Sequence, residues 1–353
     1  MLPWVDKQIA EREFENVLVR VPNPLGDQIM ATPALDSVRR RYPNAHITGF
    51  GTENAFRIFE GGTWFDDFIT IGRREKTMSQ VRKIRSQPRR YDACLLMTGS
   101  LRTAIVPFIA RIPHRMGYRW SGRTALLTAS WSRPRTDGKR SPYPTKTYFN
   151  DLVTGLGCEP EGRIRLATTP EVVARSEEWM SRNGIDPKAP LLPMCVGAAF
   201  GPSKLWPAEY FAKVADHMIE KHGMTVLLLV APSEAEIGEA VQKHAKHELI
   251  SSDRDPLAVD LMKAVIQHAD VLLTNDTGPR HVAAAFRRPI VCVMGPTSPV
   301  YTETDNEETT ILREEGIDCS PCHLKECPID HRCMVRITPD RAIAALEEIL
   351  TTR

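Results

Sequence analysis

Short apolar runs alternate with amphipathic segments over the second half of the chain. The runs have the length of buried strands, and the segments between them place their apolar residues on one helical face. We expect strands at residues 191–196, 225–230, 271–274 and 290–294, and helices at residues 207–222, 234–244, 256–268 and 279–286. Because strands that alternate with helices are typical of parallel sheets with right-handed crossovers, the pattern predicts an α/β fold.

The first half shows the same alternation. Strands are predicted at residues 16–21, 46–51 and 92–97, and a helix from about Leu101. Between the first two strands, apolar residues from Ile29 to Val38 fall on one helical face, but Pro33 interrupts them. We expect either a new helix there, with Thr32 as its cap and Pro33 at its first position, or a kink.

A chain of 353 residues is long enough for two domains. We expect a first domain over residues 1–170, a hinge region at 170–190 and a second domain over residues 171–337, with a cysteine-rich excursion at 319–333. The terminal segment 338–353 contains a last helix, capped by Thr338 and with Pro339 at its first position.

The small net charge of +2 conceals a division along the chain. Residues 1–170 contain 27 Lys and Arg against 16 Asp and Glu, which leaves +11, and the remainder contains 19 against 28, which leaves −9. A basic half indicates an anionic partner, although a solvated basic surface is the commoner reason for such a charge run. No nucleic-acid-binding motif and no interleaved aromatic residues accompany it, so nucleic acid is not the expected partner.

The sequence also indicates where in the cell the protein is located. No apolar run approaches the ~20 residues of a membrane-spanning helix, and the opening residues lack the basic-then-apolar order of a signal peptide. We therefore expect a cytoplasmic protein without a transmembrane segment. Its eight cysteines should be reduced there.

Polar residues gather between the predicted strand at 271–274 and the helix that follows it. The turn contains Asp276, Thr277, Gly278, Arg280 and His281. Ligands of open α/β sheets bind at the carboxyl ends of strands, and a helix N-terminus there offers free N–H groups and a positive dipole to a phosphate. An ordinary helix capped by Asp276 or Thr277 is the alternative. A similar turn at residues 295–297 follows the next strand.

Two further candidates follow strands. Lys204 lies in a glycine-containing loop after the predicted strand at 191–196, where a point charge could reach a diphosphate, although a solvated surface lysine is the plainer interpretation. Asp27 follows the first strand, where a carboxylate can act as a general base or simply cap a helix.

Four cysteines form a cluster in the sequence, and the first two have the Cys-x2-Cys spacing of metal ligands. They are Cys319, Cys322, Cys327 and Cys333. A structural zinc site is one interpretation, in which His323 or His331 could replace a cysteine. A loop packed by apolar thiols is the other.

Together these segments resemble the ADP-heptose:lipopolysaccharide heptosyltransferases, glycosyltransferase family 9, and within that family the heptosyltransferase II group. The matching segments occur in the family's order, and the resemblance extends from about Asn16 to the C-terminus. They are residues 19–35, 101–104, 112–115, 117–118, 123–127, 204–207 and 276–281.

The resemblance implies a GT-B architecture, in which two Rossmann-like parallel-sheet domains face a central cleft. The first domain would bind the acceptor and the second the ADP-sugar donor. The implied reaction is inverting transfer of heptose from ADP-heptose to the anionic inner core of lipopolysaccharide. An enzyme with such an acceptor would work as a peripheral protein at the inner face of the inner membrane.

The resemblance also implies roles for single residues. Asp27 would be the catalytic base. Donor-binding residues would be Lys204, Glu234, Asp276, Thr277, Gly278 and His281. Arginine forks suit carboxylates and phosphates. Four arginines in the matching part of the chain between residues 101 and 127 are therefore candidate acceptor ligands, with pairing at helix ends as the alternative: Arg102, Arg115, Arg119 and Arg123.

We expect no metal in the reaction itself. Negative charge grows on the departing ADP, and fixed cations and backbone N–H groups can stabilise it. Asp253 and Asp255 have the spacing of a metal-binding pair, but they precede a predicted helix and are interpreted as caps and solvated charge. The competing hypothesis is a catalytically silent nucleotide-binding protein of the same fold, against which the presence of Asp27 argues.

Overall fold

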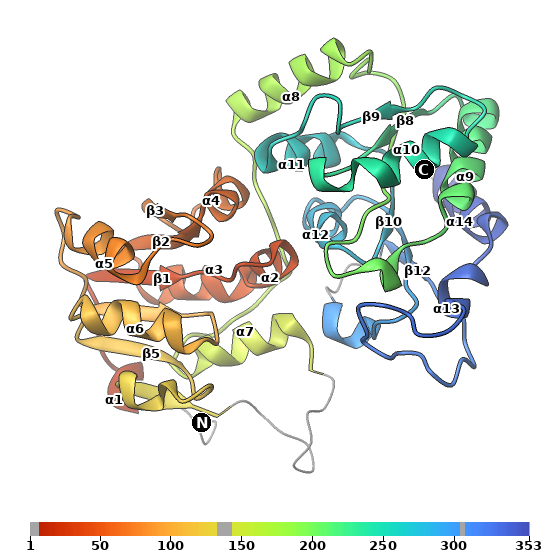
Figure 1. Ribbon diagram of the computed structural model, residues 1–353. Helices are drawn as coiled ribbons and strands as arrows, with labels where there is room; N and C mark the ends of the chain where they lie inside the picture. The colour runs from red at the N-terminus through yellow and green to blue at the C-terminus, as the bar shows by residue number, and fades with distance from the viewer. Residues whose placement is uncertain (1–6, 133–142, 304–307, 353) are drawn as a thin grey trace. The chain divides into compact units, whose positions relative to one another are not determined.

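The computed structural model describes residues 7–132, 143–303 and 308–352, and it contains two compact units (Figure 1). The described residues up to Ala167, together with Val300–Glu303, form the first unit. Thr168–Pro299 and the described residues from 308 onward form the second. Each unit has its own six-stranded parallel sheet, which confirms the predicted α/β class.

The first sheet has the strand order β3-β2-β1-β4-β5-β6. Its central strand pairs with both neighbours in parallel, so that Val17 lies opposite Ile47 on one side and Ala93 on the other. The strands are β1 (Asn16–Arg20), β2 (His46–Thr52), β3 (Asp67–Ile71), β4 (Ala93–Leu96), β5 (His114–Tyr118) and β6 (Ala129–Trp131). This is the order of a Rossmann-type doubly wound sheet.

Helices cover both faces of this sheet, because right-handed crossovers change face where the strand order reverses. The helices α2, α3, α4 and α7 form one group of packed neighbours, and α5 and α6 pack together as another. The helical segments are α1 (Lys7–Ala10), α2 (Leu25–Met30), α3 (Thr32–Arg41), α4 (Glu53–Phe59), α5 (Thr77–Arg85), α6 (Leu101–Ile109), η1 (Arg123–Leu126) and α7 (Thr145–Thr154).

The second sheet repeats the first. Its order is β12-β11-β10-β7-β8-β9, which is the Rossmann order again when the strands are counted from the start of the unit. The strands are β7 (Leu191–Cys195), β8 (Thr225–Leu228), β9 (Ile250–Ser251), β10 (Leu272–Asn275), β11 (Ile290–Val293) and β12 (Thr309–Leu312). The four central strands β7, β8, β10 and β11 lie where the sequence predicts them, within a few residues at each end.

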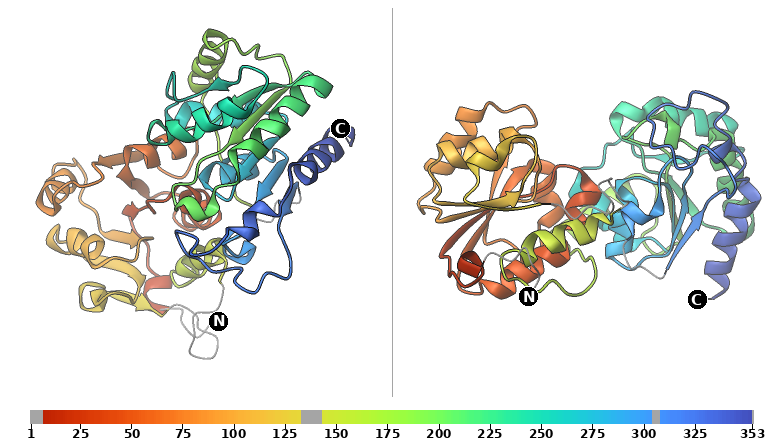
Figure 2. Two further views of the ribbon diagram at one scale, coloured as in Figure 1. Left: turned by 45° about the vertical axis from the view of Figure 1, so that its right-hand side comes forward. Right: turned by 90° about the horizontal axis from the view of Figure 1, so that it is seen from below.

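The helices of the second unit also form two groups. The helix α9 packs against α10 and α14, and α11 packs against α8 and α12; Figure 2 shows α14 running beside α9. The helical segments are α8 (Pro170–Arg182), η2 (Pro202–Lys204), α9 (Ala208–His222), η3 (Pro232–Glu234), α10 (Ala235–His244), α11 (Val259–His268), α12 (Gly278–Ala285), η4 (Pro299–Thr302), α13 (Arg332–Val335) and α14 (Pro339–Thr351).

Each sheet has a separate apolar core. In the first unit Leu18 and Leu96 are buried with side chains from α5 and α6. In the second, Phe211 of α9 and Leu346 of α14 are fully buried against the strands. No helix in the described parts of the chain is both long enough and apolar enough to cross a bilayer.

Pro33 does mark a new helix, but its cap differs from the prediction. The helix α2 ends at Met30, and α3 begins at Thr32 with Ala31 as its N-cap. The Thr32 hydroxyl donates instead to the Ile29 carbonyl at 2.8 Å. Because of this break, α2 is a separate short helix after the carboxyl end of β1. The helix α2 carries Asp27.

The expectation of a hinge at residues 170–190 was wrong, because most of this region is the helix α8. The Thr169 hydroxyl caps the helix by accepting from the Val172 N–H at 3.3 Å. Trp179 is buried and donates to the Asp255 carbonyl at 3.0 Å. The Asp255 carboxylate is paired with Arg182 at 2.7 Å, as expected of an ordinary structural charge.

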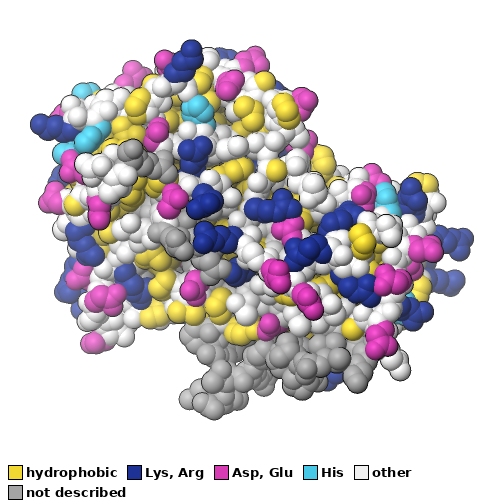
Figure 3. Space-filling model, turned by 180° about the vertical axis from the view of Figure 1, so that it is seen from behind, with side chains coloured by type: hydrophobic (Ala, Val, Ile, Leu, Met, Phe, Trp, Pro, Cys, Tyr) yellow, Lys and Arg dark blue, Asp and Glu magenta, His cyan; other side chains and the backbone are white. Residues whose placement is uncertain are grey.

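Basic side chains of the first unit are intermixed with acidic ones on the face seen in Figure 3. Several of them form ion pairs within the unit: Arg39–Asp66, Arg41–Glu13, Lys83–Glu75 and Arg165–Asp36. Four more of the 27 basic residues lie at 133–142, outside the described residues. Part of the positive charge of the first unit is therefore paired with acidic side chains of the same unit.

Candidate active site

Each sheet reverses its strand order at one point, between β1 and β4 in the first unit and between β7 and β10 in the second. Ligands of open α/β sheets bind beyond the carboxyl ends of the strands at such points. Asp27 follows β1, Lys204 follows β7, and Asp276 follows β10. The candidate base and the candidate donor residues thus lie at equivalent positions of the two sheets.

Hydrogen bonds fix the turn that carries Asp27. The buried guanidinium of Arg20 donates to Asn23 Oδ1 at 3.0 Å. Gln28 Nε2 donates to the carbonyls of Pro22 at 3.1 Å and Asn23 at 3.0 Å. The two prolines around Asn23 restrict the backbone further. Asp27 therefore sits in the first turn of α2, on a short helix anchored at its N-terminal end.

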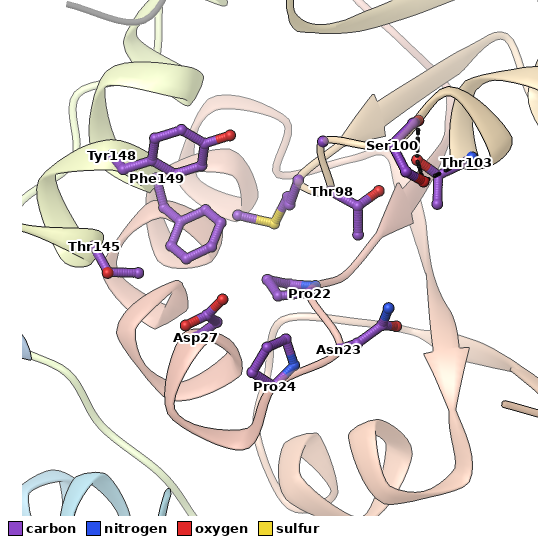
Figure 4. A pocket seen from close by; sticks show the side chains of 12 residues that line it. Pro22, Asn23, Pro24, Asp27, Thr98, Ser100, Thr103, Thr145, Tyr148 and Phe149 are labelled. Carbon is purple, nitrogen blue, oxygen red and sulfur yellow. Dashed lines mark hydrogen bonds between the residues drawn. The ribbon is translucent and has the colours of Figure 1, made fainter. Parts of the chain in front are cut away.

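The Asp27 carboxylate faces a cavity of about 380 Å³ within the first unit (Figure 4). Within the described residues, no side chain forms a hydrogen bond or ion pair with this carboxylate, and burial raises its pKa to about 6. A carboxylate with this pKa is ionised at neutral pH and is a better proton acceptor than an ordinary aspartate. The arrangement suits a general base.

The rest of the cavity wall combines aromatic rings with hydroxyl groups. Tyr148 and Phe149 come from α7, and Thr98 and Ser100 from the turn after β4. The full lining is Pro22, Asn23, Pro24, Asp27, Met97, Thr98, Gly99, Ser100, Thr103, Thr145, Tyr148 and Phe149. Apolar walls with a few directed polar groups are typical of small-molecule sites.

In the second unit, Asp276 lies at the centre of a cluster of charged side chains. Its Oδ2 accepts from Lys204 Nζ at 2.6 Å and from the Thr297 hydroxyl at 2.7 Å. Its Oδ1 pairs with Arg280 Nη1 at 3.2 Å. Lys204 also donates to the Asp276 carbonyl at 2.9 Å and lies 5.0 Å from the ring centroid of Phe200. Lys204 is therefore a held cation rather than a solvated one.

The electrostatics of this cluster favour an anion. Burial alone would raise the pKa of Asp276, but the charges of Lys204 and Arg280 and the hydrogen bonds from Lys204 and Thr297 lower it to about 2. One carboxylate between two cations leaves a net charge of +1 in a buried place. Such a charge attracts a phosphate more strongly than it would in water.

The N-terminus of α12 lies beside this cluster. Thr277 is the N-cap residue, but its side chain makes no capping hydrogen bond, and the Asp276 carboxylate binds Lys204, Arg280 and Thr297 instead. Neither side chain therefore caps α12 in the way the alternative interpretation of this turn required. The N–H of Gly278 and the helix dipole remain available to an anion.

His281 and Glu234 are placed differently from Lys204. Burial first, and then the charge of Arg280, lowers the pKa of His281 to about 3, so its imidazole is neutral. Its Nδ1 has no hydrogen-bond partner in the part of the chain that the structure describes. Glu234 ends η3 and lies against the loop after β7, where a Cβ added to Gly197 would come within 2.3 Å of Glu234 Oε2.

Residues 79–332 match the sequence model of glycosyltransferase family 9 (heptosyltransferase). The chain belongs to glycosyltransferase family 9. It is 26% identical to the lipooligosaccharide heptosyltransferase 2 of Haemophilus influenzae over 364 aligned residues, which cover 95% of this chain and 99% of that protein.

Two solved structures share the fold of this family 9 glycosyltransferase. A glycosyltransferase family 9 protein of Veillonella parvula matches with a TM-score of 0.81 at 21% identity, over 97% of this chain and 98% of that one. The ADP-heptose lps heptosyltransferase II of Escherichia coli matches with a TM-score of 0.78 at 24% identity, over 96% and 99%. The predicted GT-B fold is thereby confirmed.

The four candidate arginines divide into two kinds. Arg102 and Arg119 are exposed on the first unit; Arg102 donates to the Glu75 carbonyl, and Arg119 donates to Ser130 at 3.1 Å. Arg115 is half-buried, and Arg123 is fully buried. This difference bears directly on their expected role as acceptor ligands.

Arg115 and Arg123 both donate to backbone carbonyls of their own unit, but only Arg123 is fully buried, so a direct contact with the acceptor stays a prediction for Arg115. Arg115 donates to three backbone carbonyls, including that of Leu126 at 2.7 Å. Arg123 is fully buried and donates to the carbonyls of Tyr118, at 2.9 Å, and Thr98. Arg123 therefore positions the wall of the Asp27 cavity from behind and does not reach its surface.

The four clustered cysteines all line one small cavity of about 50 Å³ in the second unit. Cys319 is exposed, Cys322 and Cys327 are half-buried, and Cys333 is buried. Burial first, and then the neighbouring thiols, raises the pKa of Cys333 to about 11. The remaining cysteines, Cys94, Cys158, Cys195 and Cys292, are buried singly.

Sequence reasoning missed the far wall of the Asp27 cavity. Thr98 and Ser100 had a usable signal, because they end a predicted strand and precede a predicted helix, as Asp27 does. Tyr148 and Phe149 had none, because α7 is distant in sequence and reaches the cavity only through the fold. Thr297 lies in the turn at 295–297 that was noted as similar, but its bond to Asp276 was not foreseen.

Proposed function

We propose that this protein transfers heptose from ADP-heptose to the anionic inner core of lipopolysaccharide with inversion at the anomeric carbon. The observation that carries the proposal is the carboxylate of Asp27, which has no charge partner among the described residues and faces a cavity at the strand reversal of the first unit. Family membership makes the protein a glycosyltransferase, and the names of its relatives suggest the donor and the acceptor.

The proposed chemistry needs one base. Asp27 removes the proton of the acceptor hydroxyl as that oxygen attacks the anomeric carbon of the donor. The bond from this carbon to the diphosphate oxygen breaks, through a transition state with oxocarbenium character. A single displacement of this kind inverts the configuration of the sugar. The aromatic and hydroxyl wall of the cavity would hold the acceptor sugar.

The leaving group is ADP, and the cluster around Asp276 suits it. Lys204, Arg280 and the free N–H groups of α12 provide positive charge where negative charge develops on the diphosphate. We therefore propose transfer without a metal ion in the reaction. Glu234 would contact the nucleoside, and Thr277 and Gly278 the diphosphate. Neutral His281, buried in the first turn of α12, would support this turn.

The acceptor's carboxylates and phosphates require cations on the first unit. Arg102 and Arg119 are the exposed candidates, and each already has one backbone carbonyl as an anchor. Because the acceptor is a lipid-anchored sugar, we place the reaction at the cytoplasmic face of the inner membrane, with the protein bound peripherally.

The test is incubation of the full chain with ADP-heptose and a set of truncated lipopolysaccharide acceptors, followed by mass spectrometry. Product should gain one heptose, with ADP released in equal amount, and only on acceptors that carry the accepting hydroxyl. Asp27→Asn provides the matched control. ADP binding without turnover on any acceptor would contradict the proposal and favour the silent nucleotide-binding protein.

A further inference from the structure

The cysteine-rich segment has no apolar core of its own. Residues 318–331 form no helix or strand, and none of them is buried. Leu324 and Ile329 are even strongly exposed. Small segments that cannot bury enough apolar surface are commonly held by disulfides or by a metal ion. Polar and sulfur atoms, and not apolar packing, must therefore stabilise this segment.

Four sulfur-bearing side chains surround the same small cavity. Cys319, Cys322, Cys327 and Cys333 all line it, and the rest of its wall is largely apolar, including Leu324 and Pro328. His331 also lines it, but its Nε2 lies 2.6 Å from the Ser203 carbonyl and is occupied there. His323 is not part of the wall. The four thiols therefore form a complete ligand set on this wall, and His331 could bind a metal only through its Nδ1.

We propose that these four cysteines bind one thiophilic metal ion, Zn²⁺ or iron, in a closed tetrahedral site. Tetrahedral sets of four thiolates are typical of these two metals. Metal–sulfur bonds of about 2.3 Å would bring the sulfurs to about 3.8 Å from one another. No three of the four sulfurs lie within 4.8 Å of one another in this structure, so the thiols must rotate into the cavity that they line to complete the site. Each thiol releases its proton on binding.

The segment braces the loop that carries Lys204. The Ser203 N–H donates to the Lys325 carbonyl at 3.0 Å, and the Ser203 hydroxyl donates to the Leu324 carbonyl at 2.5 Å. Gly201 has φ +152, and a Cβ there would meet the Lys325 carbonyl at 2.6 Å. This close approach of two backbones explains the glycine.

The segment also braces the turn that carries Thr297. The His323 N–H donates to the Pro296 carbonyl at 2.9 Å, and the Ser320 hydroxyl donates to the Gly295 carbonyl at 2.8 Å. Thr297 and Lys204 both donate to the Asp276 carboxylate. A metal ion in the cysteine site would therefore hold both loops of the donor cluster in place. A closed site leaves no position for substrate, so the metal takes no part in transfer.

The metal site is tested on the full chain, purified under reducing conditions without chelator. We expect about one zinc or iron atom per chain by mass spectrometry, and thiolate-to-metal charge-transfer bands after replacement by Co²⁺. Cys322→Ser and Cys327→Ser should each lose at least nine-tenths of the metal. Glu326→Gln, at an exposed residue next to Cys327 in the sequence, should keep it.

A second control addresses metal bound elsewhere. His217, His222 and Glu347 have ligand atoms within 4.8 Å of one another and could bind a metal. His217→Ala should leave the metal content unchanged if the cysteines hold the ion. Less than one-tenth of a metal atom per chain in the parent, and no charge-transfer bands with Co²⁺, would overturn the proposal, as would loss of the metal in His217→Ala alone.

The bracing role rests on the proposed function and has its own measurement. Release of the metal from the parent protein by a thiol-reactive mercurial, which avoids any folding defect of the variants, should weaken ADP binding about tenfold or more by calorimetry. Unchanged ADP binding with the metal released would overturn the bracing role and leave the site intact. Absence of ADP binding in the loaded parent would count against the proposed function, whatever the metal content.

Discussion

Replacement of Asp27 by asparagine should make the protein more stable while it destroys activity. The carboxylate has no charge partner among the described residues, and burial raises its pKa from 3.8 to about 6. A raised pKa means that the folded state disfavours the charged form. The free energy of unfolding, as far as Asp27 determines it, is therefore highest at low pH. It falls as the pH rises from about 4 to about 6.

The size of the effect follows from these two values. Ionisation of Asp27 in the folded state costs about 1 kcal/mol at pH 4.5 and about 3 kcal/mol at pH 8, when linkage is evaluated for pKa values of 3.8 and about 6. Asp27→Asn removes this cost and keeps the shape. For a cooperative unit of this size, each kcal/mol shifts the melting temperature by about 2–4 °C.

Thermal melts of the parent and Asp27→Asn at pH 4.5 and pH 8 test the argument. The variant should melt higher at both pH values, by about 2–4 °C at the lower and about 6–12 °C at the higher. Asp36→Asn is the matched control, because Asp36 is paired with Arg165 at 2.5 Å and its loss should lower the melting temperature. An equal shift of Asp27→Asn at both pH values, or a lower melting temperature at pH 8, would refute the desolvation argument.

The same variant should lose ~10²–10⁴ in turnover and retain ADP binding, measured by product mass spectrometry and calorimetry. With the parent, kcat/KM should rise with pH to a plateau and titrate near pH 6, and a profile without this limb would exclude Asp27 as the base. Lys204→Ala should weaken ADP binding ~10-fold or more and slow transfer, and unchanged calorimetry would contradict the role of Lys204. Arg102→Ala with Arg119→Ala should raise the acceptor KM and leave the donor KM unchanged; an unchanged acceptor KM would contradict their role. Brief treatment with EDTA should leave turnover unchanged; loss of turnover that Mg²⁺ restores would show a metal in the reaction.

The central strands were predictable because they are buried on both faces. Every residue of β7 and β11 is buried, and such strands appear in the sequence as short unbroken apolar runs. The edge strand β12 was not predictable, because three of its four residues are partly or fully exposed and its sequence has no clear hydrophobic period. Similarly, β5 begins with His114 and Arg115, so no apolar run marks it.

The helix α8 was missed for a different reason. Its residues have a helical period, with Val172, Ser176, Trp179 and Met180 buried. Pro170 at its start and its place between the two halves favoured a hinge instead. Proline at the first position of a helix is common, since the missing N–H has no partner there in any case. The cap at Thr169 was therefore the better signal.

The location of a candidate residue was predictable where it follows from the order of the strands alone. Asp27, Lys204 and Asp276 each follow a central strand, and the strand order of a doubly wound sheet brings such residues to its ligand-binding edge. The direction of a long side chain does not follow from position. Arg123 is in a basic segment like the exposed Arg102, yet its guanidinium is fully buried and donates to the carbonyls of Tyr118 and Thr98.

The donor cluster shows why charge at a site is a property of the group and not of one residue. Lys204 was expected to approach a diphosphate as an independent cation, but it is bound to Asp276 through both the carboxylate and the carbonyl. Arg280 supplies the second charge that keeps the cluster positive. A lysine held in this way loses little conformational entropy when a ligand arrives. In the proposed reaction, the same ion pair that lowers its free charge would therefore preorganise Lys204 for the charge that develops on the leaving group.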